Sequence, residues 1–449
     1  MSTIPQLPHD FQLSLRHFTK LVHLNSILRQ ANIYKTRGIR VTVLFEWLLT
    51  ATFSRYSIFR AHQDPRFTKK TVRNCLNDPH TNWQRLVILI AYRLVTYVQH
   101  FTDDKRRQAF ILDDSLFKRQ FSQHTELLAR VFDHDKQVYL KGFRALTLGW
   151  SDSNTFLPVD FSLVSSSKQQ NVLGPEKRFD ARSLAAKRRR QAQRKLNDVG
   201  LELIDAAQKN GFTSKYVLFD SWFTSPHMFA ELLKRHLFGV GMLKRSKKVY
   251  FRYRGRQMDV KTLYENLRRS KWPHHENYLY SPLVKFQVGD QEMPVKLVYI
   301  VDRNVADQYL VLGTTKTSLR PEEIIQLYAR RWQIENYFKV AKQYLQFDQT
   351  QIQNYDGLCG HMAMVMMSYD ILALVQRETI DERTMGDLFF YLGEPLPDIQ
   401  LVEALSWLIK QLNGLVKNSV LDDNIINELF TSFMQTLPSN LERLLGNIA

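Results

Sequence analysis

The spacing of apolar residues changes character along the chain. Apolar positions recur at helical spacing in residues 41–53 and again in 83–98, so residues 11 to about 105 are predicted to be helical. Between these stretches lies the basic segment TKKTVRNCLN, residues 68–77, which is bounded by Pro65 and Pro79. It predicts a short helix that exposes Lys69, Lys70 and Arg73, either to a ligand or simply to solvent.

From residue 109 the pattern becomes that of short strands. AFILDDS (109–115), GFRALTLGW (142–150) and FLPVDFSLV (156–164) each read as a strand, and SDSN (151–154) as a turn. A long basic helix is predicted from about 181 to 209, followed by the buried strand KYVLFDSWF (215–223). Three antiparallel strands, a helix and a strand indicate an α/β fold compatible with a ribonuclease-H-like core.

The second half of the chain is expected to complete this core. Residues 241–311 are rich in Tyr, Lys, Arg and alternating β-branched residues, which predicts a mainly β insertion. A single strong helix is expected from Pro321 to Leu345, with the proline in its first turn. The resulting division is a helical region 1–105, core parts 106–240 and 312–375 on either side of the insertion, and a helical region 376–449.

Charge indicates the kind of partner. The chain holds 62 Lys and Arg against 44 Asp and Glu, a formal charge of +18, which favours a polyanion such as DNA. The longest apolar runs, 86–98 and 361–375, contain Arg93 and Asp370 and are expected to be buried helices rather than membrane spans. Two cysteines exclude a disulfide scaffold or a zinc ribbon. We expect a cytoplasmic, nucleoid-associated protein.

Three acidic positions follow apolar strands and are candidates for chemistry. Asp113 and Asp114 end the first predicted strand, and Asp220 ends another. Carboxylates at the carboxyl ends of core strands are well placed to face a ligand, and their burial is costly without a cation. Taken singly, each is more often a turn or cap residue than a metal ligand.

The predicted helix at 321–345 adds a fourth acid. At 100° per residue, one stripe about 80° wide carries five residues: Tyr328, Arg331, Glu335, Lys339 and Lys342. The opposite side carries Ile334, Tyr337, Phe338, Ala341 and Leu345. The polar stripe could be a solvated face with ion pairs at i,i+4. However, one acid among three cations over-neutralises the face, which better suits an acid on a metal and cations on DNA phosphates.

The spacing Tyr-x2-Arg-x3-Glu-x6-Lys, met by Tyr328, Arg331, Glu335 and Lys342, resembles the signature of DDE transposases of the insertion-sequence-four family. ILDDSLF and VLFDSWF resemble that family's first and second aspartate strands. The separations of 107 residues from Asp113 to Asp220 and 115 from Asp220 to Glu335 leave room for the family's β insertion. The resemblance covers roughly residues 109–345.

The resemblance implies a catalytic triad of Asp113, Asp220 and Glu335 that holds two Mg²⁺ ions, for which Mn²⁺ could substitute. Asp113 is preferred over Asp114 as the ligand, although the choice stays open. The implied activity is cut-and-paste transposition: binding of terminal inverted repeats, cleavage of the DNA and joining of its 3′ ends to a target. A hairpin intermediate stays open, and a homodimer on DNA is expected because two ends must be held together.

Further residues are expected to contact DNA. The resemblance implies phosphate contacts for Tyr328, Arg331 and Lys342, and Lys339 shares their stripe. Arg188 and Arg189 belong to the basic block 187–190, which could otherwise be a solvated helix face. The segment 244–256 mixes Lys and Arg with Tyr and Phe, as does a strand that stacks on DNA or an ordinary edge strand protected by lysine.

Three tryptophans are also of interest. Trp272 could stack on a flipped base, as the resemblance implies, or could be a packed core residue. Trp222 and Trp332 are expected to be core residues or to support the site. Two other functions remain open: a non-catalytic DNA-binding regulator, which the presence of all three acids disfavours, and a structure-specific nuclease without strand transfer.

Overall fold

The computed structural model describes residues 9–55, 64, 66–102, 106–133, 136–246, 250–270, 275, 278–301, 309–379 and 432. Trp272 and nearly all of the expected C-terminal helical region, 376–449, lie outside these residues. Contacts divide the chain into two compact units, residues 1–393 and 394–449, and every element below belongs to the first.

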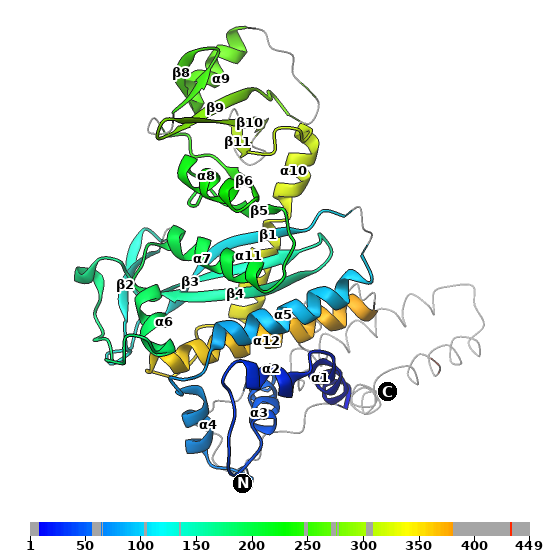
Figure 1. The fold of residues 1–449 in the computed structure, drawn as a ribbon, viewed down its shortest axis with the longest axis vertical. Helices are drawn as coiled ribbons and strands as arrows, with labels where there is room; N and C mark the ends of the chain where they lie inside the picture. Colours follow the sequence, from blue (N-terminus) through cyan, green and yellow to red (C-terminus); the bar gives the residue numbers. More distant parts are fainter. Residues whose placement is uncertain are drawn as a thin grey trace, which may run out of the picture. The chain divides into compact units, whose positions relative to one another are not determined.

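Helices form the described part of the N-terminal region. They are α1 (His9–Leu21), α2 (Leu24–Gln30), α3 (Val41–Phe53), α4 (Lys69–Leu76) and α5 (Trp83–Gln99). Helix α5 begins after Asn82, whose side chain accepts a hydrogen bond from the Arg85 amide at 3.0 Å and so caps the first turn. Apolar residues of α5 are buried against strand β4 and helix α12 (Figure 1).

A mixed sheet forms the centre of the unit. Its core strands are β1 (Ala109–Lys118), β2 (Ala129–Asp133), β3 (Val138–Ser151), β4 (Phe156–Val164), β5 (Tyr216–Phe219) and β6 (Phe238–Met242). Strand β3 pairs antiparallel with β1, β2 and β4, whereas β5 runs parallel to both β1 and β6. Antiparallel pairs on one side of β1 and parallel strands on the other are consistent with the ribonuclease-H-like fold.

The helices between β4 and β6 correct one prediction. Residues 181–209 do not form a single helix but two, α6 (Leu184–Ala192) and α7 (Leu196–Lys209). The Ala192 carbonyl, which a continuous helix would use internally, instead accepts the Ser165 amide at 2.7 Å after β4. This tertiary hydrogen bond ends α6. Helix α8 (Pro226–Lys234) then connects β5 to β6.

The segment expected to be a β insertion continues the same sheet. Its elements are β7 (Tyr250–Tyr253), β8 (Arg256–Asp259), α9 (Val260–Arg269), β9 (Leu283–Val288), β10 (Gln291–Val301) and β11 (Tyr309–Thr314). Strand β11 pairs antiparallel with β6, so the order along the sheet is β2-β3-β1-β5-β6-β11-β10-β9-β7-β8 (Figure 1). Strands far from β1 in this order are therefore connected to it by an unbroken ladder.

The expected single helix at 321–345 is also two helices, α10 (Pro321–Ala329) and α11 (Trp332–Gln343). Between them the backbone tightens: the amides of Arg331, Gln333 and Ile334 each bond the carbonyl three residues earlier, at 2.9, 3.0 and 3.2 Å. The predicted apolar stripe is nevertheless buried. Its five residues are Ile334, Tyr337, Phe338, Ala341 and Leu345.

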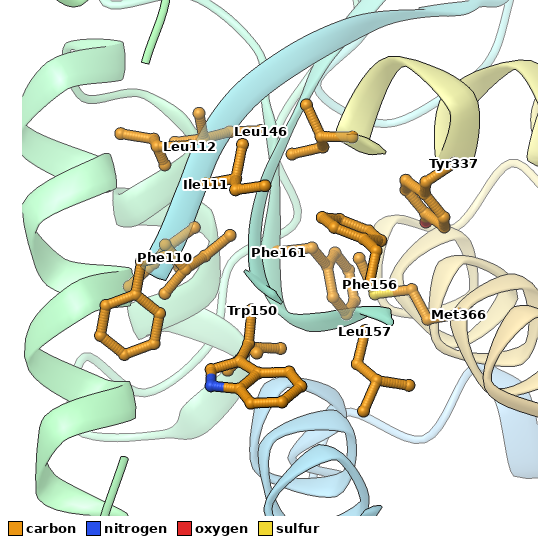
Figure 2. Packing of buried hydrophobic residues seen from close by; sticks show 14 of the residues in the cluster. Phe110, Ile111, Leu112, Leu146, Trp150, Phe156, Leu157, Phe161, Tyr337 and Met366 are labelled. Carbon is orange, nitrogen blue, oxygen red and sulfur yellow. The ribbon is translucent and has the colours of Figure 1, made fainter. Parts of the chain in front are cut away.

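The core lies between the sheet and the helices. Phe110 and Leu112 of β1 face α7, and a side chain at Gly200 of that helix would collide with Leu112 (Figure 2). On the other face Phe156 packs against Tyr337 of α11, with ring centroids 5.8 Å apart (Figure 2). The central strands are covered on both faces, which explains why β4 is buried along its whole length.

Helix α12 (Tyr355–Thr379) is the longest apolar helix among the described residues. By length and composition it could cross a membrane, but 89% of its most apolar window is buried inside the protein. It packs against α5, α3 and β4 (Figure 1). Residues 86–98 and 361–375 are thus buried core helices, as predicted.

Candidate active site

The sheet brings Asp113 and Asp220 to the same level. Ladder β1–β5 begins at the pair Ala109 and Tyr216 and ends at Leu112 and Phe219. The next residues along the two strands are Asp113 and Asp220, so both carboxylates lie where the parallel pairing stops. Strand β1 itself continues to Lys118 on its β3 side, which corrects the expectation that it ends at the acids.

Asp113 and Asp114 point to opposite faces of β1, since successive strand residues alternate. The Asp113 carboxylate faces α11 and accepts a hydrogen bond from Arg331 at 3.4 Å. The Asp114 carboxylate is 3% exposed and forms an ion pair with Arg144 of the neighbouring strand β3. This arrangement supports Asp113 as the functional acid of the pair.

Arg331 joins two of the three predicted acids. Its Nη1 atom lies 3.4 Å from Asp113 Oδ2 and 2.6 Å from Glu335 Oε1. Arg331 occupies the tightened turn before α11, so Glu335 follows one helical turn later and faces the same way. The arginine side chain is 9% exposed, and its Nε atom is buried without a hydrogen-bond partner.

The acids of the strand ends lie close enough to repel one another. Burial and the negative charges of Asp114 and Asp220 raise the pKa of Asp113 to about 8, although Arg331 and the Asp114 amide favour its charged form. Asp220 is fixed by its own loop, because Oδ1 accepts the Trp222 amide at 2.8 Å. One guanidinium does not balance this many carboxylates, and the cluster keeps an excess of negative charge.

A divalent metal suits this donor set. Among the described residues, no three acidic, histidine or cysteine side chains stand close enough together to hold a metal in the present arrangement. Yet carboxylate oxygens are the ligands that Mg²⁺ prefers, and neighbouring acids whose repulsion raises a pKa are stabilised by a cation. The chemistry of Asp113, Asp220 and Glu335 therefore suits a divalent metal ion. Arg331 lies between Asp113 and Glu335.

The other residues of the predicted stripe lie along α10 and α11. The Tyr328 ring centroid is 5.6 Å from the Arg331 guanidinium, and burial raises the pKa of its phenol to about 12. Lys339 is exposed to solvent. Lys342 is half-buried, with its ammonium 6.0 Å from the Phe347 ring centroid. The stripe thus has an interior end at Tyr328 and Arg331 and an outer end at the lysines.

Trp222 and Trp332 are not core residues, which excludes one of the two expected roles; that they support the site stays a prediction. Trp222 is 49% exposed and Trp332 is 59% exposed. Each has a cation near its ring: Lys244 Nζ lies 4.4 Å from the Trp222 centroid, and the Arg331 guanidinium lies 5.3 Å from Trp332. Their positions beside Asp220 and Arg331 in sequence were the only signal, and apolar character pointed to burial.

Arg188 and Arg189, expected to contact DNA, lie in the interior instead. Arg189 is fully buried and pairs with Glu126 and Asp356; Arg188 pairs with Asp356 and bonds the Thr81 carbonyl. Every charge in this cluster is compensated inside the protein. A phosphate cannot reach these guanidinium groups in this arrangement, so the prediction is wrong for both residues.

The predicted basic helix is present as α4. Lys69, Lys70 and Arg73 are all exposed on it. Their side chains are accessible to a ligand, and their proposed contact with DNA stays a prediction.

Comparison with known proteins agrees with this geometry. Residues 52–291, just over half of the chain, match the model of a family described as DDE superfamily endonuclease. The chain belongs to this family, a class of enzymes that act on DNA. The matched part includes Asp113 and Asp220, whereas Glu335 lies beyond it. A comparison with curated proteins finds no match.

Proposed function

We propose that this endonuclease is a transposase of the insertion-sequence-four type, which binds transposon ends, cuts them and joins their 3′ ends to target DNA. The observation that carries the proposal is the contact of Arg331 with both Asp113 and Glu335, beside Asp220 at the end of the neighbouring strand β5. The signature spacing on α10 and α11 supports the finer assignment, because Tyr328 and Arg331 lie together at the acids.

Asp113, Asp220 and Glu335 would hold two divalent cations, Mg²⁺ or Mn²⁺, which supply an activated water nucleophile and stabilise the leaving oxygen. Arg331 has a different task. Its planar guanidinium can donate two hydrogen bonds to one phosphate. It can move from the acids to the DNA because the divalent cations would then balance the charge of the acids. Tyr328 holds the guanidinium from its other side.

The other cations extend the interaction with DNA. Lys339 and Lys342 follow the acids along α11, and Lys69, Lys70 and Arg73 form a basic surface on α4. Replacing all three α4 cations by Ala should flatten the salt dependence of end binding by up to about three units of slope. An unchanged slope would assign α4 to the solvated surface.

The catalytic test uses the full chain with DNA that carries its terminal inverted repeats. Cleavage and joining should require Mg²⁺ or Mn²⁺. Asp113→Asn, Asp220→Asn and Glu335→Gln should each lower cleavage by at least about a thousandfold while DNA binding persists. Asp114→Asn is the matched control and should remain active, since that carboxylate faces Arg144. Full cleavage by Asp220→Asn would exclude the proposed site.

The same assay separates the alternative functions. Cleavage without joining would identify a structure-specific nuclease. Binding of the ends with no cleavage under any divalent cation would identify a non-catalytic regulator. Measuring mass in the presence and absence of DNA tests the expected homodimer, which should form on paired ends.

A further inference from the structure

A cleft of about 1090 Å³ lies apart from the carboxylates. Its walls come from α3 and α4, from the residues that follow β1, and from the segment that joins α11 to α12. None of Asp113, Asp220 or Glu335 lines it. The cleft is therefore a separate feature, and its lining determines what it can bind.

Strand β1 and helix α11 both lead from the acids to this cleft. Phe117 lies four residues beyond Asp113 on the same face of β1, about 13 Å along the strand. Its ring packs against Phe347 and His361, with centroids 5.6 and 6.4 Å apart, and His361 lines the cleft.

The lining is basic. It contains one carboxylate, Asp348, and four cations: Arg73, Lys118, Arg119 and Lys177. Arg119 already has a structural task, since its Nη2 donates to the Ile352 carbonyl at 2.8 Å and its Nη1 donates to the Thr350 carbonyl. It holds the segment between α11 and α12 against the end of β1. Lys118 and Lys177 are exposed and can bind an anion.

Amide side chains make up much of the remaining wall, at Gln120, Gln349, Gln351, Gln353 and Asn354. An amide both donates and accepts hydrogen bonds, which suits the edges of bases better than it suits phosphate alone. Two polar atoms of the lining, Asn77 Oδ1 and Gln346 Nε2, are buried without a hydrogen-bond partner in the protein. Such atoms favour a polar occupant.

An aromatic ring stands at the edge of the cleft. Phe121 is 96% exposed, the most exposed of the large apolar side chains described. Its backbone is nonetheless fixed in a turn, because the Ser122 amide bonds the Arg119 carbonyl at 3.0 Å and the Arg119 amide bonds the Lys141 carbonyl at 2.8 Å. A ring held in solvent beside cations and amides is suited to stack on an unpaired base.

We propose that this cleft binds an unpaired DNA strand, with Phe121 stacked on a base and Lys118 and Lys177 on the adjacent phosphates. The cleft lies on the path of a strand that leaves the carboxylates along β1 and α11. The proposal thus rests on the proposed function for its biological role, but binding in the cleft requires no metal and no cleavage.

The test measures binding alone. The full chain is titrated in EDTA with a fluorescent oligothymidine of roughly ten nucleotides and with a duplex of equal length. Phe121→Ala should weaken binding of the single strand about tenfold, and Phe121→Trp should retain it. Lys118→Ala should lower the salt slope for the single strand by about 0.7. Duplex binding should change little in all three variants.

Phe101→Ala is the matched control, since Phe101 is 52% exposed. Its carbonyl bonds Arg377, which lies sixteen residues, about 24 Å, from His361 along α12. Equal affinities of the Phe121→Ala and Phe101→Ala proteins for the single strand would overturn the proposal. An equal loss of duplex binding in Phe121→Ala would also overturn it, since the cleft would then hold paired DNA. Binding is measured in EDTA and does not depend on cleavage, so Asp113→Asn should not change it. Either proposal can therefore fail while the other holds.

Discussion

Two clusters of arginines and carboxylates in this molecule differ in their balance of charge. In the interior, Arg188 and Arg189 face Glu126 and Asp356, two cations against two acids. At the ends of the paired segments of β1 and β5, one cation, Arg331, contacts Asp113 and Glu335, and Asp220 lies close enough to Asp113 to raise its pKa. The first cluster is complete by itself, whereas the second has a deficit of positive charge.

The two clusters differ in their hydrogen bonds as they do in their charge. Glu126 Oε1 accepts from Arg189 and from the Lys177 amide, and Glu126 Oε2 accepts from Arg189 and from the Tyr355 amide. By contrast, Arg331 shares one nitrogen between two acids and leaves another buried without a partner. A saturated cluster stabilises a fold, and an unsaturated one can exchange its internal contacts for a substrate and a cation.

The largest effect on stability is expected in the saturated cluster. Arg189→Met should destabilise the protein by about 3–5 kcal/mol, because Glu126 and Asp356 would remain buried without their common partner. Thermal unfolding measures the loss. Arg190→Met, on the exposed neighbouring residue, should change stability by no more than about 0.5 kcal/mol. Equal effects of the two changes would show that the buried cluster is not a structural unit.

In the unsaturated cluster the effect should fall on the reaction. Arg331→Lys keeps the charge but loses the bidentate fork, so the steps after first nicking should slow by about 10- to 100-fold, the equivalent of one hydrogen bond to a charged group. Nicking, double-strand cleavage and joining are measured separately on intact and pre-cut ends. Arg320→Lys, on an exposed arginine of the same region, should leave all three rates unchanged.

An equal loss at every stage would mean that Arg331 only builds the site. No loss at any stage would return the stripe on α10 and α11 to a set of ordinary ion pairs.

Asp160 extends the comparison to a buried acid, for which the described residues show no ion pair with an arginine. Burial raises the pKa of Asp160 to about 8, and its Oδ2 has no hydrogen-bond partner. The folded state therefore holds a proton that the unfolded state releases near pH 4. The contribution of this group is fully present below about pH 4 and is lost as pH rises towards 8.

Asp160→Asn removes this titration. The variant should match the wild type near pH 4, and its advantage in stability should grow by about 1.4 kcal/mol for each pH unit above that, until the pH reaches the pKa of Asp160 in the folded state. Urea unfolding at a series of pH values measures the difference. A stability gap that is constant across the series would mean that Asp160 is ionised in the folded protein.

The smallest effect concerns the cation itself. Arg331→Met removes the guanidinium that Asp113 and Glu335 share, so Mg²⁺ should stabilise the variant more than it stabilises the wild type. The expected gain is about 1 kcal/mol at roughly five times the dissociation constant. Thermal unfolding with and without Mg²⁺ measures it, and adding Asp113→Asn to the variant should remove most of the gain. If neither change alters the stabilisation by Mg²⁺, the ion binds elsewhere.

The sequence determined the periodic parts of this protein by itself. The period of apolar residues located the strands around Asp113 and Asp220, the buried helices at 86–98 and 361–375, and the buried side of α11, because burial imposes a repeat on each element. The resemblance carried by the spacing of Tyr328, Arg331, Glu335 and Lys342 also implied Glu335 as the third acid, and in the structure Glu335 shares Arg331 with Asp113. Periodicity and spacing depend only on residues that are close together in the sequence.

Only the tertiary structure decided the rest. A run of basic residues looks the same whether its charges meet carboxylates from distant segments, as Arg188 and Arg189 do, or meet solvent, as Lys69 does. The break after α6 depends on a hydrogen bond from Ser165, and the separation of Asp113 from Asp114 depends on which faces of β1 the helices cover. Trp222 and Trp332 are exposed, although their apolar character alone favours burial. In each case the free energy of a side chain depends on partners that are far away in sequence.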